Sequence, residues 1–343
     1  MNIRNISYYN YKKIYNYNKI MSYLNNKYKS TIVTMFFDLT ELKDSTHKTR
    51  NAEFYLNHGR AILQLENPMI IFCDSKTKPR IKEIRDELIG INDLTIYIEK
   101  NISEYDFYKN NWGIVQKNRQ PFSYYLEHDY TRVTVSHSLT VMFKIFAIQI
   151  AAERNDFNTT HYVWMDFGCN HIAPYNIKEA SLAMLNNPHP KVGILYIHYR
   201  DRKELENMIL FCNSGICSLA TTIFTVQKEY VSLLYTSVLS VFYEQLFNHV
   251  LHTDEQVFIY VYDRNPELMT IYYGDYYSVI TNYHKPVRDW HSIKWCFIES
   301  ALMFNRLDLA KEASRKVYDS VMSGLITDML DEDILYFKQI IDK

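Results

Sequence analysis

Three short apolar runs, each closed by an aspartate, constrain what this chain can fold into. They are residues 31–37 before Asp38, residues 69–73 before Asp74, and residues 162–165 before Asp166. All three are rich in β-branched and aromatic residues and too short for ordinary helices, so we predict buried strands. Ligands of open α/β sheets bind beyond the carboxyl ends of the strands, which is where these aspartates would lie.

The third run is the most informative, because Asp166 is followed closely by Gly168. A strand end holds Asp166 on a rigid support, and Gly168 lets the chain turn close to a bound ligand. Such a carboxylate suits a hard divalent cation. The alternative is that Asp166 only caps the next turn.

Helical patterns alternate with the strand patterns. Pro79 opens a helix whose apolar residues Ile81, Ile84 and Leu88 share one face, and residues 94–98 form the next strand. This order predicts a parallel βαβ unit with a right-handed crossover. The following segments are a helix to about residue 154, a strand at 192–199, a mostly helical stretch at 220–249 and an ambiguous run at 257–262. Three helices are expected near 290–304, 308–323 and 331–342.

Charge and cysteine content narrow the possible functions. The chain of 343 residues has 38 Lys and Arg against 39 Asp and Glu, so no overall basic field favours nucleic acid as a partner. The five cysteines are scattered without a CxxC pair, which indicates neither a disulfide framework nor a zinc knuckle. We therefore expect a reducing compartment, the cytoplasm.

The most apolar stretches are poorly suited to crossing a membrane. Residues 139–152 are interrupted by Lys144 and Gln149, and residues 215–247 by three polar residues at 227–229. Residues 1–30 lack the apolar segment of a secretory signal. A soluble protein without a transmembrane segment is expected.

Five sequence blocks, taken together and in order, resemble the HtrL/YibB-like family, which includes WlaTC-type glycosyltransferases. The blocks are residues 31–38, 67–74, 163–168, 254–256 and 273–276. The resemblance implies an α/β fold of the GT-A type, with a Rossmann-like mixed sheet flanked by helices. It divides the chain into an N-terminal extension (1–29), a GT-A-like domain (30–288) and a C-terminal helical extension (289–343), which could also form a homo-oligomer contact.

The resemblance also implies a metal site, with one departure. Most metal-dependent GT-A enzymes carry Asp-x-Asp where this chain has Asp166 and Gly168. A Mn²⁺ or Mg²⁺ ion would then need diphosphate oxygens, water and one further protein ligand, for which His284 is the candidate. The alternative for His284 is an exposed turn histidine, and His171 and His291 are weaker candidates.

Further residues are expected to bind the nucleotide of the donor sugar or to take part in proton transfer. Asp254 and Glu255 would take the proton of the acceptor hydroxyl, unless they only begin a helix. Lys285 and Lys144 would contact the phosphates, although Lys144 could be ordinary helix surface. Asp38 and Asp74 would contact the base or ribose of the nucleotide, or simply turn the chain.

The function implied is a metal-dependent glycosyltransferase that moves a sugar from a nucleoside-diphosphate sugar to a hydroxyl acceptor on a glycan or glycoconjugate. One alternative is a nucleotidyltransferase on a related sheet, but residues 38–49 lack the glycines of its loop. Another is a non-catalytic binding or scaffold protein. No GxGxxG, Walker, GxSxG or HExxH pattern supports other enzyme classes.

Overall fold

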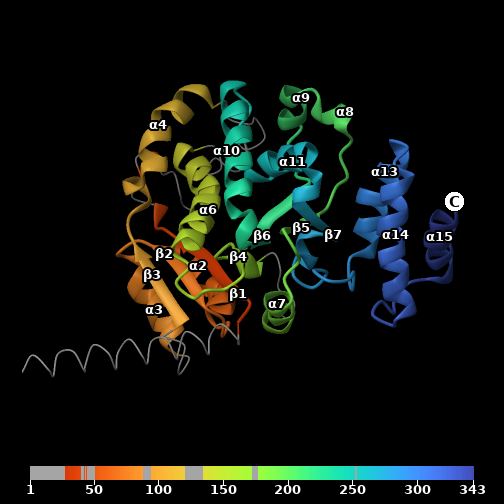
Figure 1. The fold of residues 1–343 in the computed structure, drawn as a ribbon, viewed down its shortest axis with the longest axis horizontal. Helices are drawn as coiled ribbons and strands as arrows, with labels where there is room; N and C mark the ends of the chain where they lie inside the picture. Colours follow the sequence, from red (N-terminus) through yellow and green to blue (C-terminus); the bar gives the residue numbers. More distant parts are fainter. Residues whose placement is uncertain are drawn as a thin grey trace, which may run out of the picture.

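A seven-stranded mixed sheet forms the centre of the protein in a computed structural model that describes residues 28–39, 42, 44, 51–87, 94–119, 134–171, 177–251 and 253–343 (Figure 1). Its strands are β1 (Ser30–Phe36), β2 (Met69–Cys73), β3 (Thr95–Glu99), β4 (His161–Met165), β5 (Val192–Tyr196), β6 (Leu219–Gln227) and β7 (Met269–Tyr273). They lie in the order β3-β2-β1-β4-β6-β5-β7. Strand β6 is antiparallel to both of its neighbours, whereas the other paired strands are parallel. Most of the expected N-terminal extension lies outside the described residues.

The α/β class and the first five predicted strands are confirmed, but the prediction for residues 220–249 is wrong in its first part. Strand β6 occupies Leu219–Gln227, and the expected helix begins only afterwards, as α10 (Val231–Phe247). An apolar stretch fits either a buried strand or a buried helix by periodicity alone. Here β6 pairs with strands on both sides, and these backbone hydrogen bonds decide the outcome.

Helices cover both faces of the sheet (Figure 1). One face is covered by α4 (Asp106–Asn118), α6 (Val135–Arg154), α10 and α11 (Asp254–Arg264), and the other by α2 (Ala52–Leu63), α3 (Thr77–Asp86) and α7 (Ile177–Asn186). The ambiguous run 257–262 thus lies within a helix. Two short helices, α8 (Arg202–Leu205) and α9 (Met208–Asn213), follow β5.

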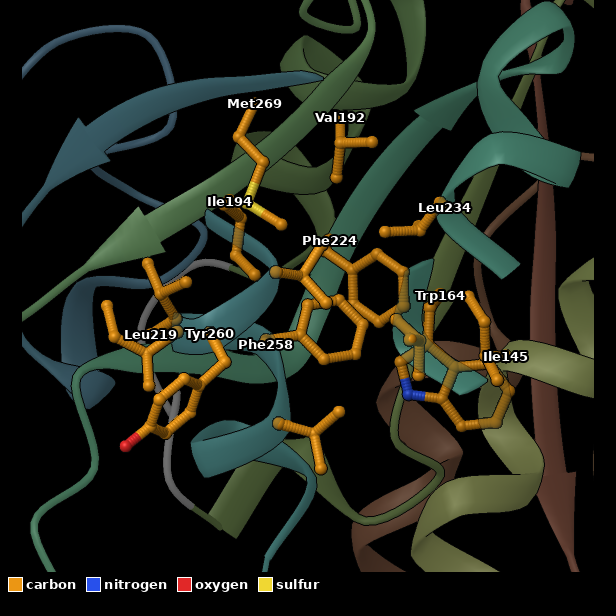
Figure 2. Close-up of a cluster of buried hydrophobic side chains, with 14 of the residues drawn as sticks. Ile145, Trp164, Val192, Ile194, Leu219, Phe224, Leu234, Phe258, Tyr260 and Met269 are labelled. Atoms are coloured by element: carbon orange, nitrogen blue, oxygen red, sulfur yellow. The ribbon is translucent and has the colours of Figure 1, made fainter. Parts of the chain in front are cut away.

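Alternation along the strands produces two separate hydrophobic cores. Trp164 of β4 faces the core under α6 and α10, while its neighbours Val163 and Met165 face the core under α2. In the first core Phe224 of β6 packs against Phe258 of α11 with ring centroids 5.3 Å apart (Figure 2). A sheet buried on both faces gives strands that read as continuous apolar runs, as observed in the sequence.

Helix α6 is the one helix in the described part of the chain that is long and apolar enough to cross a membrane. However, 61% of its apolar window is buried against the sheet and neighbouring helices, so its composition is that of a core helix. Lys144 is the one charged side chain among the buried residues of this helix.

The C-terminal helical extension is confirmed. It comprises α12 (Trp290–Ser292), a π-helical segment (Ile293–Ile298), α13 (Glu299–Met303), α14 (Leu307–Met322) and α15 (Asp331–Asp342). Phe337 and Ile340 of α15 are buried with Val317 of α14 in the same core as the sheet. The expected homo-oligomer contact through these helices stays a prediction.

Arg85 of α3 joins that helix to the loop that precedes β2, and it is fully buried. Its guanidinium donates hydrogen bonds to the carbonyl oxygens of Leu63, Leu65 and Asn67. We expect Arg85→Met to lower the free energy of unfolding by about 3 kcal/mol or more, because these buried carbonyls lose their donor. Urea denaturation measures the loss.

Arg80→Met on the same helix is the matched control. Arg80 is 52% exposed and forms surface ion pairs with Glu53 and Glu83, so its removal should cost at most about 1 kcal/mol. Equal losses in the two variants would contradict the role given to Arg85.

Candidate active site

A cavity of about 860 Å³ opens at the carboxyl-terminal edge of the parallel strands. Residues that follow β1, β4 and β5 line it, namely Asp38, Asp166 and His198. Because β6 is antiparallel, its first residues lie at the same edge and contribute Thr221. The helices add Lys144 from α6 and Glu255 from the start of α11. A volume of this size is typical of small-molecule sites.

Lys144 lines this cavity and lies between two carboxylates. Its Nζ is 2.6 Å from Asp254 Oδ2 and 3.3 Å from Asp166 Oδ1, and it donates to the carbonyl oxygen of Thr221 at 3.2 Å. Burial alone would lower the pKa of Lys144, but the charges of Asp166 and Asp254 outweigh burial and raise it. The side chain is only 5% exposed, so the alternative of ordinary helix surface is wrong, while the expected contact with the phosphates stays a prediction. With its donors used by the protein, Lys144 positions the two acids.

Asp166 faces the cavity, and its side chain is 39% exposed. The indole Nε1 of Trp164 donates to its Oδ1 at 2.7 Å, next to the contact with Lys144. Burial raises the pKa of Asp166, and the Lys144 ammonium opposes this shift. At Gly168 the chain passes close to the side chain of Tyr55. A Cβ at this position would lie 2.9 Å from the tyrosine ring. Gly168 thus allows a close approach to Tyr55, and its expected close approach to a bound ligand stays a prediction.

Asp254 and Glu255 begin α11, but they have different surroundings. Thr253 is the N-cap residue of this helix, so Asp254 does not serve as its cap. The hydroxyl of Thr221 donates to Asp254 Oδ2 at 2.5 Å. Burial would raise the pKa of Asp254, yet Lys144 and Thr221 lower it overall. Asp254 is therefore a fixed anion and a weak base.

Glu255 has the properties of a proton acceptor near neutral pH. Burial, followed by the negative charge of Asp254, raises its pKa to about 7. The hydroxyl of Tyr276 donates to Glu255 Oε1 at 2.6 Å, and Cys217 also lies beside this carboxylate. Of the two acids named from the sequence, Glu255 is the one whose pKa matches general base catalysis.

The end of the cavity near β1 is aromatic. Phe36 and Phe167 stack with centroids 4.8 Å apart, and Tyr55 lies beside Phe36. Asp38 lines this end, and its expected contact with a nucleotide base or ribose stays a prediction. Flat apolar rings of this kind can pack against a base.

Asp74 does not line the cavity. Its carboxylate accepts hydrogen bonds from the backbone amides of Asp38, Lys76 and Thr77, and its side chain is buried. The structure therefore favours the alternative reading, in which Asp74 turns the chain. Asp74 also holds the backbone that presents Asp38.

The two residues expected from the 282–286 segment do not reach the site. His284 and Lys285 are exposed and outside the cavity lining, and His284 Nε2 contacts the carbonyl oxygen of Ala183 in α7 at 3.2 Å. The alternative of an exposed turn histidine describes His284 correctly. His291 is exposed and stacks on Trp290. His171 does line the cavity, with its Nδ1 bonded to the Gly168 carbonyl.

Sequence reasoning missed several cavity residues. His198 and Arg200 follow β5 just as Asp166 follows β4, so the rule that located Asp166 could have found them. Tyr276 lies in a block that carries the family resemblance but received no role. Thr221 gave no signal, because its strand was taken for helix.

The fit of a divalent cation rests on Asp166. Among the described residues, no group of three or more His, Cys, Asp or Glu side chains could hold a metal ion. Trp164 and Lys144 both contact Oδ1 of Asp166, so Oδ2 takes part in neither of these contacts. Asp166, Lys144 and Asp254 form one group, called the Lys144 group below. With both acids ionised, its one positive and two negative charges give a net charge of minus one. A cation fits here only with Asp166 as a single protein ligand and oxygens from substrate and water.

The solved structures to which this chain is similar share little sequence with it. A 4-diphosphocytidyl-2C-methyl-D-erythritol synthase from Anaerococcus prevotii is 11% identical with a TM-score of 0.37, over 82% of this chain and 98% of that one. An active-site mutant of LgtC is 9% identical with a TM-score of 0.37, over 88% and 98%. The PaToxG glycosyltransferase is 12% identical with a TM-score of 0.29, over 98% and 94%.

No curated protein matches the chain. A family model described as a bacterial protein of unknown function, HtrL_YibB, matches residues 28–284. This range contains every strand of the sheet and all the cavity residues named above. The protein therefore belongs to the HtrL_YibB family.

Proposed function

We propose that this protein is a glycosyltransferase that moves a sugar from a nucleoside-diphosphate sugar to a hydroxyl group of a glycan or glycoconjugate. One observation carries the proposal. A single cavity combines an aromatic end, the Asp166–Lys144–Asp254 group, and Glu255 with a pKa near 7. The likeness of the sequence blocks to WlaTC-type glycosyltransferases agrees with this arrangement.

The order of these groups along the sheet suggests how the donor binds. The base and ribose would lie by Phe36, Tyr55 and Asp38 beyond β1, because flat rings and a carboxylate suit those groups. The diphosphate would then extend toward Asp166 beyond β4. The sugar would lie between Asp166 and Glu255, and the acceptor beyond β5.

Asp166 is the residue that would hold Mg²⁺ or Mn²⁺, through its Oδ2. When bound, such an ion supplies positive charge that stabilises the departing diphosphate. Lys144 keeps Asp166 and Asp254 in fixed positions, since it contacts both. His284 has no part in this proposal, because it lies outside the cavity lining.

Glu255 supplies the proton transfer. As the acceptor oxygen bonds to the anomeric carbon, the bond from that carbon to the β-phosphate oxygen breaks and its electrons leave with the diphosphate. The hydroxyl proton passes to the Glu255 carboxylate, which is the role of a base in an inverting transfer.

The cysteines in the chain are all free, which supports the expected cytoplasmic location.

The reaction products separate this proposal from its alternatives. Glycosyl transfer or donor hydrolysis releases a nucleoside diphosphate, whereas a nucleotidyltransferase releases pyrophosphate from a nucleoside triphosphate. A scaffold protein would release neither. Incubation with a panel of nucleotide sugars and Mn²⁺, followed by chromatography of the nucleotides, tests all three.

Asp166→Asn should reduce release of the nucleoside diphosphate about 100-fold, because the cation that would stabilise the departing diphosphate loses its charged protein ligand. Calorimetric titration of nucleoside diphosphates with Mn²⁺ should also show weakened binding. Asp156→Asn is the matched control, since Asp156 is paired with Arg154 on the surface before β4. Undiminished activity of Asp166→Asn would sink the proposed role.

Activity should depend on pH through Glu255. A base with a pKa of about 7 is ionised above that pH, so the rate of transfer should rise as pH increases through 7. Glu255→Gln should lose this dependence together with most of the activity. Tyr276→Phe should move the rise to higher pH, because the tyrosine hydroxyl lowers the pKa of Glu255. A rise at the same pH in Tyr276→Phe would contradict this assignment.

Lys144→Met should lower both stability and activity. It leaves Asp254 buried without its cation, which costs about 3–5 kcal/mol of the free energy of unfolding. The double variant Lys144→Met/Asp254→Asn should regain much of the stability, since the uncompensated charge is gone, but none of the activity. Thermal denaturation and donor turnover measured on the same samples distinguish the two effects, and recovery of both would refute a positioning role.

A further inference from the structure

The wall of the cavity beyond β5 contains a second set of polar groups. His198 and Arg200 follow this strand, and Gly215 and Cys217 lie on the loop that precedes β6. Cys217 lies beside Glu255, and its carbonyl oxygen contacts His198 Nδ1 at 3.3 Å. This wall therefore continues from the proposed base, on the side away from the aromatic end.

Arg200 is the unusual member of this wall. Lys144 and Arg200 are the permanently charged cations among the described residues that line the cavity, and Lys144 is already held by two carboxylates. The side chain of Arg200 is 17% exposed, and its Nη1 donates to Glu204 Oε1 at 3.1 Å. Its Nε is buried and has no hydrogen-bond partner among the described residues.

Nε, the donor of Arg200 that lacks a partner among the described residues, lies on the edge of the guanidinium that suits bidentate recognition. Nε and Nη2 form a planar pair of donors whose spacing matches two oxygens of a carboxylate or phosphate. Glu204 contacts Nη1, at the other end of the group, and so leaves Nε without a hydrogen-bond partner among the described residues. A buried donor without a partner costs free energy, which a bound anion would recover.

In the part of the chain that the structure describes, no neighbouring group makes a hydrogen bond with Arg200 Nε. Burial lowers the pKa of His198, so its imidazole is neutral at pH 7. Asp275 is an acid near His198, and its Oδ2 accepts a hydrogen bond from the Ser292 hydroxyl. Arg200, whose Nη1 is paired with Glu204, is thus the permanent cation on this wall.

We propose that Arg200 makes the enzyme specific for an acceptor that carries a carboxylate or a phosphate group. This inference rests on the proposed function, because it names the acceptor of that site. The anion binds at the Nε and Nη2 edge of Arg200, and the acceptor hydroxyl then points toward Glu255. Neutral sugars lack the group that satisfies Arg200 and bind more weakly.

Binding of matched sugars by the full chain tests the inference. Methyl β-D-glucuronide carries a carboxylate, glucose 6-phosphate carries a phosphate, and methyl β-D-glucoside is neutral. Calorimetry in the presence of a nucleoside diphosphate should give a Kd at least about tenfold lower for one anionic sugar than for the neutral one. The preferred anion identifies the acceptor chemistry, and the preference should weaken at high salt.

Variants assign the preference to one side chain. Arg200→Gln should remove it, and Arg200→Lys should retain part of it because the charge remains without the planar fork. Arg264→Gln is the matched control, since Arg264 is also paired with a glutamate but lies outside the cavity lining. Equal binding of neutral and anionic sugars by the wild type, or a preference that survives in Arg200→Gln, would overturn the proposal.

Nucleoside diphosphate binding by the wild type, measured without any sugar, separates this inference from the proposed function. Absence of nucleotide binding would remove both. Nucleotide binding without preference for an anionic sugar would remove only the role of Arg200. Should Arg200→Gln fail to fold, the wild-type comparison and Arg200→Lys still decide the question.

Discussion

The buried ammonium of Lys144 is the interaction on which the site depends. Two carboxylates from separate parts of the chain, Asp166 after β4 and Asp254 at the start of α11, approach the same side of the sheet. Without a cation between them they would repel each other at the edge of a low-dielectric core. Lys144 removes this repulsion, and the Thr221 hydroxyl completes the hydrogen bonding of Asp254. The three elements are thereby fixed relative to one another.

The reversed direction of β6 is what makes such a meeting possible. In an all-parallel sheet, only strand ends would reach the carboxyl-terminal edge. Because β6 runs the other way between β4 and β5, its first residues lie at this edge and carry Thr221 next to Lys144. The chain then returns through α10 to α11, whose first turn brings Asp254 and Glu255 to the cavity.

Charge is arranged along the cavity from one end to the other. The aromatic end near β1 is followed by the Lys144 group with its excess of negative charge, then by Glu255 with a raised pKa, and finally by Arg200. An arrangement of this kind suits two substrates bound end to end, with chemistry between them. Burial raises the pKa of both Glu255 and Asp254, but contact with Lys144 and Thr221 lowers the pKa of Asp254 overall, so the two acids end with opposite shifts.

The sequence alone determined the class of the fold and one edge of the site. Short β-forming runs closed by Asp38 and Asp166 predict strands whose ends meet at a ligand site, because that rule depends only on local pattern and on the geometry of parallel sheets. It failed where local pattern is ambiguous. Leu219–Gln227 reads as helix or strand, and pairing on both sides makes it β6. Likewise His284 has the right residue type, but only the path of the chain shows that it lies against Ala183 rather than in the cavity. The partners of Lys144 and the buried, unpartnered Nε of Arg200 depend on how residues far apart in the chain pack among those that the structure describes, so only the tertiary structure decided them.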